Sequence, residues 1–246
     1  MAKKKAPNTA GDALRDIEES GDRVAEWASQ NAALILGAIA VVLVLSAGVG
    51  LYIQHGSNAR DEAANELALT TGNYRLAMGA DAAGGRIVEP ANPELAVNTR
   101  TEYAEKFSEV ARKHSGTAAG ALAWLEAGTL QADLGKAEHA TVSFEAARDA
   151  SSGLAIQAIA NTRLAGLAED RGDPVSAAKA FEAAATVKSY PLRGEALTEA
   201  ARCWAEAGEA DRAMAVFQRF ETEFPDELAA PQIGSLIAEL RLASQP

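Results

Sequence analysis

Residues 121–147 read ALAWLEAGTLQADLGKAEHATVSFEAA, and the pattern in this stretch returns twice further along the chain. A glycine, an alanine five residues later and a phenylalanine four residues after that occur three times, at spacings of 37 and 36 residues. The three sets are Gly135, Ala140 and Phe144, then Gly172, Ala177 and Phe181, then Gly208, Ala213 and Phe217. Such a pattern suits a helix-turn-helix unit, because glycine permits the turn, alanine lets the second helix lie close to the first, and phenylalanine fills the gap to the next unit. The chain from Ala121 onward is therefore predicted to be a stack of helical pairs.

The three units resemble the tetratricopeptide repeat. The first unit carries the family's order of large, small, Gly, small, aromatic and Ala at Trp124, Gly128, Gly135, Ala140, Phe144 and Ala147. The second unit departs from it at Asn161, where a large apolar residue is usual. The resemblance implies an all-α solenoid over residues 99–246, with Thr99–His114 as the second helix of a preceding unit and Leu228–Leu242 as a capping helix. An alanine-rich bundle without repeats is the alternative.

The stretch at residues 32–53, AALILGAIAVVLVLSAGVGLYI, contains 22 residues and no charge. About 20 apolar residues in a helix are enough to cross a bilayer, so a single transmembrane helix is predicted here. A cleaved secretory signal is the alternative, but its apolar core is typically about 7 to 15 residues long and lies near the N-terminus. Six acidic residues also precede this stretch. We therefore expect an uncleaved signal anchor.

The distribution of Lys and Arg predicts how the anchor is oriented. Five of them precede the span, whereas only Arg60 lies within the twenty residues after Ile53. Because Lys and Arg are enriched on the cytoplasmic side, residues 1–31 are expected to be cytoplasmic, as an amphipathic helix or a solvated linker. A membrane-proximal helix at 54–78, a loop at 79–98 and the repeat domain would then lie in the periplasm of a bacterium, beside the inner membrane.

Charge and cysteine content exclude several classes of protein. Five of the 23 Lys and Arg and six of the 34 Asp and Glu precede the span, so the remainder of the chain carries a net charge of −10. This charge opposes binding to nucleic acid. Cys203 is the only cysteine, so no disulfide can form within the chain.

The sequence offers little for catalysis. His55, His114 and His139 are far apart, without an acidic or cysteine partner at metal-ligand spacing. Neither a glycine-rich phosphate loop nor a nucleophile elbow is present. We expect no enzyme, no catalytic residue, no metal, no cofactor and no small-molecule substrate. An anchored hydrolase whose site has no recognisable motif is the alternative.

The resemblance to tetratricopeptide repeats implies a concave surface lined by the first helix of each unit. Residues expected to face this groove are Leu125, Thr129, Asp133, Arg163, Gly166, Glu169, Thr198, Arg202 and Glu206. An ordinary exposed helix position is the alternative for each of them. The family's carboxylate clamp is absent, because Leu125, Thr162 and Thr198 stand where Lys is expected, so binding of chaperone C-terminal tails is not implied. Arg163 and Arg202 are expected to meet an acidic partner segment.

The order of a cytoplasmic segment, one span and a tetratricopeptide domain resembles the ancillary subunit of the bacterial Sec translocon. That family associates with the translocation channel and with periplasmic chaperones. The resemblance implies an interaction module whose partners are the channel, chaperones or exported proteins. A scaffold of another envelope complex, for cell-wall, outer-membrane or cytochrome assembly, is the alternative.

Overall fold

The structure is a computed structural model that describes residues 58–80, 90 and 92–243. The predicted cytoplasmic segment and the predicted span at 32–53 lie outside these residues. In the ranges that are described, no helix is both long and apolar enough to cross a membrane. The chain divides into two compact units, residues 1–58 and 59–246, and the account below concerns the second.

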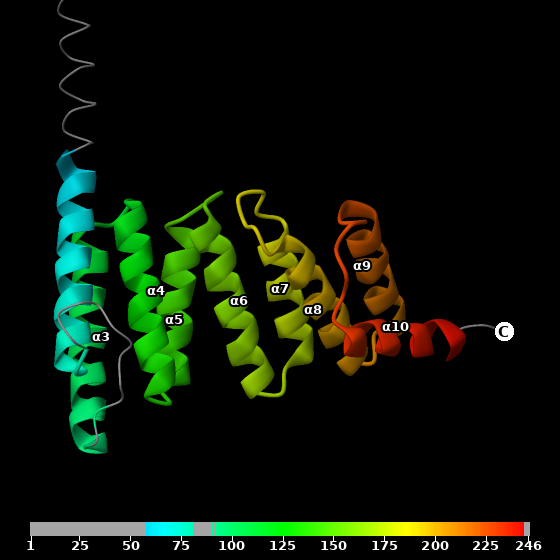
Figure 1. Ribbon diagram of the computed structural model, residues 1–246, viewed down its shortest axis with the longest axis horizontal. Coiled ribbons are helices and arrows are strands. Elements are labelled where there is room, and N and C mark those ends of the chain that lie inside the picture. Colours follow the sequence, from blue (N-terminus) through cyan, green and yellow to red (C-terminus); the bar gives the residue numbers. More distant parts are fainter. Residues whose placement is uncertain (1–57, 81–89, 91, 244–246) are drawn as a thin grey trace, which may run out of the picture. The chain divides into compact units, whose positions relative to one another are not determined.

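All regular structure in the described ranges is helical, as the sequence predicts. Residues 58–77 form the first described helix. The helices that follow are α3 (Pro93–Lys113), α4 (Ala118–Asp133), α5 (Ala137–Asp149), α6 (Ala155–Asp170), α7 (Pro174–Ala185), α8 (Arg193–Glu206), α9 (Ala210–Glu223) and α10 (Pro231–Ala243). Successive helices from α3 to α9 pack against one another, and Figure 1 shows them standing in a row.

The three predicted units correspond to the pairs α4/α5, α6/α7 and α8/α9. Gly135, Gly172 and Gly208 end the first helix of each pair with φ angles of 70°, 70° and 78°, in the left-handed region that favours glycine. α4 also contacts α6, so the first helices of the first two pairs meet. The prediction of a tetratricopeptide-like solenoid is confirmed.

The start of α3 differs from the prediction. The helix begins at Pro93 rather than at Thr99, and the Asn92 side chain accepts a hydrogen bond of 3.0 Å from the Glu94 amide. Pro93 was assigned to a loop, but proline suits the first helical position, where its missing N–H leaves no bond unmade. The predicted loop at 79–98 therefore ends before Pro93.

α3 and the 58–77 helix form a further pair before the three repeats. The Tyr74 ring lies 5.4 Å from the Tyr103 ring and 6.3 Å from the Phe107 ring, measured between centroids. Phe107 is fully buried. The 58–77 helix and α3 are thus a helical pair of their own, joined by residues 78–92.

The C-terminal cap begins later than predicted. Leu228 was expected to start the helix, but it is 97% exposed and α10 starts at Pro231. Ile233 and Ile237 of α10 are buried against the last apolar core cluster, which α8 and α9 help to form. α10 therefore covers the end of the stack, as a capping helix should.

The phenylalanines of the repeat are not equally buried. Phe144 is 1% exposed and Phe217 is 6% exposed, as predicted. Phe181 was expected to fill the gap to the next unit, but it is only partly buried, at the edge of a core cluster whose interior is filled by residues such as Leu197 and Trp204. The Phe181 ring thus packs against the core, but part of it stays in contact with solvent.

The second unit departs from the family's pattern at Asn161, yet α6 is a continuous helix from Ala155 to Asp170. Asn161 is 5% exposed and lines a cavity of about 520 Å³ between α5, α6 and α7. The polar side chain therefore borders open space where the repeat usually places a large apolar side chain.

Candidate functional site

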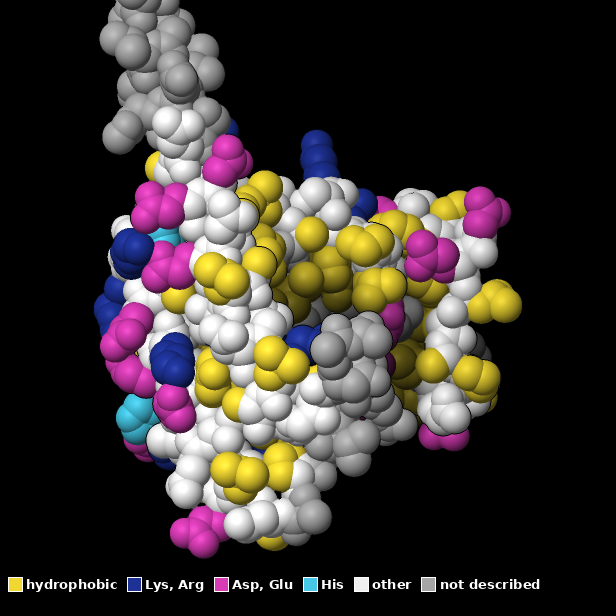
Figure 2. All heavy atoms as spheres, turned by 60° about the vertical axis from the view of Figure 1, so that its left-hand side comes forward, with side chains coloured by type: hydrophobic (Ala, Val, Ile, Leu, Met, Phe, Trp, Pro, Cys, Tyr) yellow, Lys and Arg dark blue, Asp and Glu magenta, His cyan; other side chains and the backbone are white. Residues whose placement is uncertain are grey.

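The first helices of neighbouring pairs enclose a shallow groove. A cavity of about 200 Å³ between α4 and α6 is lined by Thr129, Asp133, Arg163 and Gly166, with Phe144 and Leu167 as its apolar part. The first four are predicted groove residues. A Cβ atom at Gly166 would have no other heavy atom within 4 Å, so this position is open. Figure 2 shows one face of the molecule, with a hollow in which hydrophobic side chains gather and with both acidic and basic side chains around it.

Leu125 has a different role from its predicted groove neighbours. Its side chain packs on the core cluster of Ala140, Phe144 and Leu167. Leu125 therefore belongs to the seam between repeats at least as much as to the groove. Gly128, one turn along α4, lets α5 pack close to α4 within the first repeat, because a Cβ atom there would lie 2.6 Å from Phe144 Cε1.

Arg163 remains a candidate for contact with a partner. It is exposed, and it makes no ion pair within the residues that the structure describes. Its charge lies close enough to Glu126 of α4 to lower that side chain's pKa, whereas burial, the larger effect, raises it. Asp133 lies 4.0 Å from the Arg100 guanidinium, measured from Oδ2 to Nε.

The other three charged groove residues form one cluster between α6 and α8. The Arg202 guanidinium donates to Glu169 of α6, and to Glu199 and Glu206 of α8 at 2.7 Å each. Burial lowers the pKa of Arg202, but the hydrogen bonds to the three carboxylates outweigh it and raise the pKa above its usual range. The cluster carries one positive and three negative charges, so Arg202 is already neutralised and has no free positive charge for an acidic partner.

Cys203 lies beside this cluster without forming a reactive site. It is fully buried, with Sγ 3.8 Å from Glu169 Oε1, and burial raises the pKa of its thiol to about 12. A neutral thiol is a poor nucleophile and a poor metal ligand. Although Glu169, Cys203 and Glu206 lie close enough together to hold a cation, Arg202 already occupies both carboxylates.

Thr198, the last predicted groove residue, lies mostly inside. It is 4% exposed, and its hydroxyl donates to the Glu195 carbonyl at 2.9 Å. It lines a cavity of about 560 Å³ at the start of α8, the second cavity that holds a predicted groove residue. The structure thus distributes the predicted residues among the α4/α6 groove, the Arg202 cluster and this second cavity.

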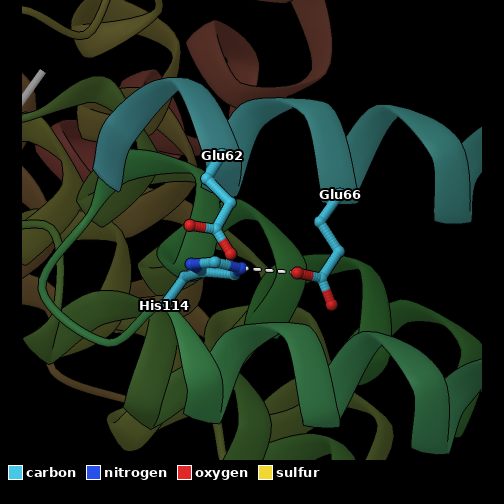
Figure 3. Close-up of side chains that lie close together, drawn as sticks. All are labelled: Glu62, Glu66 and His114. Atoms are coloured by element: carbon cyan, nitrogen blue, oxygen red, sulfur yellow. Dashed lines mark hydrogen bonds and ion pairs between the residues drawn. The ribbon is translucent and has the colours of Figure 1, made fainter. Parts of the chain in front are cut away.

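Another polar cluster joins the 58–77 helix to His114, and it was not predicted. His114 Nε2 lies 2.7 Å from Glu66 Oε2, and Glu62 points to the same place, as Figure 3 shows. His114 is separated from these residues by about fifty positions, so spacing along the chain gave no sign of the contact. The only available signal was the i, i+4 placement of Glu62 and Glu66 on one helix face.

These side chains have the types needed to bind a metal, but a lysine already supplies the cation. Lys113 Nζ lies 2.6 Å from Glu66 Oε2 and 3.4 Å from Glu62 Oε1. The hydrogen bond from Lys113, followed by that from His114, lowers the pKa of Glu66. The arrangement fixes the 58–77 helix to the C-terminal end of α3.

The groove as a whole is more acidic than basic. Its positive charges are Arg163, Arg100 beside Asp133, and the neutralised Arg202. Asp133, Asp170 and the three carboxylates around Arg202 supply negative charge. The expectation of an acidic partner segment at Arg202 therefore does not suit the structure.

Comparison with known proteins supports the same fold. No curated protein matches the chain. The family model described as a tetratricopeptide repeat-like domain matches residues 25–219, which include α3 to α8 and most of α9. Repeat domains of this kind are typically interaction modules without catalytic activity. The chain belongs to the tetratricopeptide repeat-like domain family.

Proposed function

We propose that this protein is a membrane-anchored interaction module that binds protein partners in the groove formed by α4, α6 and α8. The main support is the open surface at Gly166 between two first helices, next to exposed Arg163 and Asp133. First helices of stacked repeats present a continuous surface along which an extended or helical segment can lie. No part of this role requires catalysis.

The proposed anchor is the apolar stretch at residues 32–53, with the repeat domain in the bacterial periplasm. The excess of Lys and Arg before this stretch and the resemblance to the ancillary translocon subunit support this orientation. Anchoring would confine the groove to a thin layer beside the membrane. Weak binding then becomes effective, because the local concentration of partners that share the membrane is high.

The partners we propose are the Sec translocation channel, periplasmic chaperones or exported proteins. A photoreactive amino acid placed at Thr129 or Gly166 of the full-length chain in intact cells would capture whatever occupies the groove. The matched control is His139, which is exposed on α5, a second helix of its pair. We expect cross-links to channel subunits, chaperones or exported proteins from the groove positions and few from His139.

Other results would redirect the proposal. Cross-links to proteins of cell-wall, outer-membrane or cytochrome assembly would favour the scaffold role. Equal capture from His139 and Gly166 would contradict a role for the groove. The anchor is tested separately, since a reporter active only in the periplasm and fused after Pro246 should be active, and cytoplasmic activity would overturn the orientation.

A further inference from the structure

The second cavity, at the start of α8, combines acidic and apolar walls. It has a volume of about 560 Å³ and lies between α8 and the segment that connects α9 to α10. Glu195, Glu199 and Glu227 are its acidic lining residues, and Leu192, Phe220 and Leu228 are large apolar ones. No Lys, Arg or His is among the described residues that line it.

The negative charge of this cavity is not neutralised within the described part of the chain. Glu199 is bonded to Arg202, but Glu195 and Glu227 make no ion pair there. The neighbouring Arg193 is already engaged, because it donates to Glu223 at 2.8 Å and to the Ala185 carbonyl at 2.7 Å. Two carboxylates therefore face the cavity without a cation.

A glycine lets one of these carboxylates reach the wall. Glu227 lies directly over Gly194 near the start of α8, and a Cβ atom at Gly194 would overlap its carboxylate. Leu192, the N-cap residue of α8, makes no side-chain hydrogen bond to the first turn of the helix. A side chain at position 194 would displace Glu227, so the acidic wall depends on this glycine.

Exposed leucines lie at the same cavity. Leu228 is 97% exposed and Leu192 is 50% exposed. Water contact with large apolar side chains is unfavourable, by about 25 cal/mol for each Å² that a partner could cover. Apolar surface and unpaired negative charge thus meet at one place.

We propose that this cavity binds a lysine or arginine side chain of a partner polypeptide whose neighbouring residues are large and apolar. The aliphatic stem would lie along Leu192 and Phe220, and the charged head would reach Glu195 and Glu227. An adjacent apolar side chain would cover Leu228. This inference rests on the proposed function, because Glu199 belongs both to this cavity and to the Arg202 cluster of the groove.

Peptide binding to the full-length chain tests the inference. The probe is a labelled, capped seven-residue peptide with two lysines and two leucines among serines, followed by fluorescence anisotropy, with detergent alone as the blank. Glu195→Gln combined with Glu227→Gln should weaken binding about tenfold, since two partly exposed charge pairs are lost. Leu228→Ser should weaken it about threefold without affecting folding, because that side chain makes little contact in the free protein.

The control has the same change in charge at a distance from the cavity. Glu109→Gln combined with Glu239→Gln alters two exposed carboxylates of α3 and α10 and should leave binding unchanged. Equal binding of a peptide with glutamate in place of lysine, or equal binding by all variants, would overturn the inference. If the chain no longer distinguished the lysine peptide from the glutamate peptide but still gave cross-links from Gly166, only this site would be refuted. If the cross-links were lost and the preference for the lysine peptide remained, only the proposed function would be refuted.

Discussion

The seam between the first and second repeats differs in chemistry from the seam between the second and third. At the first, Phe144 is 1% exposed and shares an apolar cluster with Leu167 of α6. At the second, Phe181 is only partly buried, and α6 and α8 are joined by the ion pair between Glu169 and Arg202. Both seams therefore have an apolar interior, but only the second also carries an ion pair between its first helices, and we call them the apolar seam and the charged seam.

This difference shows which properties the repeat determines. Glycine turns and small alanines set the path of the backbone, and Ala140, Ala177 and Ala213 are all fully buried. The side chains at the faces between first helices are free to vary, and at α6/α8 they carry charge. The charged seam places an excess of carboxylates on the groove.

The apolar seam should be the more sensitive to truncation. Phe144→Ala should destabilise the unit by about 3 to 5 kcal/mol, because it removes a buried ring and leaves a cavity beside Gly128. Urea unfolding followed by circular dichroism measures the change. A decrease of less than about 1 kcal/mol in the free energy of unfolding would show that Phe144 is not a main contributor to the apolar seam.

The charged seam should respond most strongly to loss of its cation. Arg202→Met leaves Glu169, Glu199 and Glu206 facing one another and should cost about 2 to 3 kcal/mol, between the values for buried and exposed pairs. Adding Glu169→Gln should recover about 1 kcal/mol of this loss, since it removes one of the repelling charges. Additive losses in a double-mutant cycle would show that the two side chains do not interact.

Phe181→Ala should have a smaller effect than the equivalent change at the first seam. Because the ring lies at the edge of its core cluster, we expect a loss of about 1 to 2 kcal/mol. Thermal unfolding of the Phe144→Ala and Phe181→Ala variants side by side gives the difference directly. Equal losses would mean that both rings contribute alike and that the two seams do not differ in packing.

The repeat and its turns could be predicted because they depend on local sequence. Glycine at fixed intervals indicates turns, and alanine at fixed intervals indicates close helix contacts. Gly135, Gly172 and Gly208 do adopt the left-handed backbone conformation of such turns. The start of α3 was missed because Pro93 suits both a loop and a first helical turn. Only the Asn92 cap, a local signal that was overlooked, separates the two.

The polar clusters could not be predicted, since they depend on pairs distant in sequence. Arg202 was assigned to the groove, but nothing in the local sequence indicated that Glu169 of another helix would neutralise it. The same holds for Glu66 and His114. Residue position along a helix predicts which face a side chain occupies, whereas its partners follow from how the helices are stacked.

The smallest expected effect concerns Glu126 at the first seam. Burial raises the pKa of this carboxyl, and the nearby charge of Arg163 lowers it by less. The folded state therefore holds the proton more tightly than the unfolded state. The free energy of unfolding should fall as pH rises from the ordinary pKa of 4.5 to the higher pKa of the folded state, and stay lower above it. Glu126→Gln removes this cost and should stabilise the unit at pH 7 by less than about 1 kcal/mol.

The same variant should lose its advantage in acid. Well below pH 4.5, Glu126 is protonated in both states, so wild type and Glu126→Gln should show nearly the same dependence of stability on pH. Urea unfolding at several pH values measures this. Glu145→Gln, at an exposed position of α5, is a control whose stability should change little. A variant less stable than wild type at pH 7 would mean that Glu126 is held by a favourable charge pair, and the first seam would then be as polar as the second.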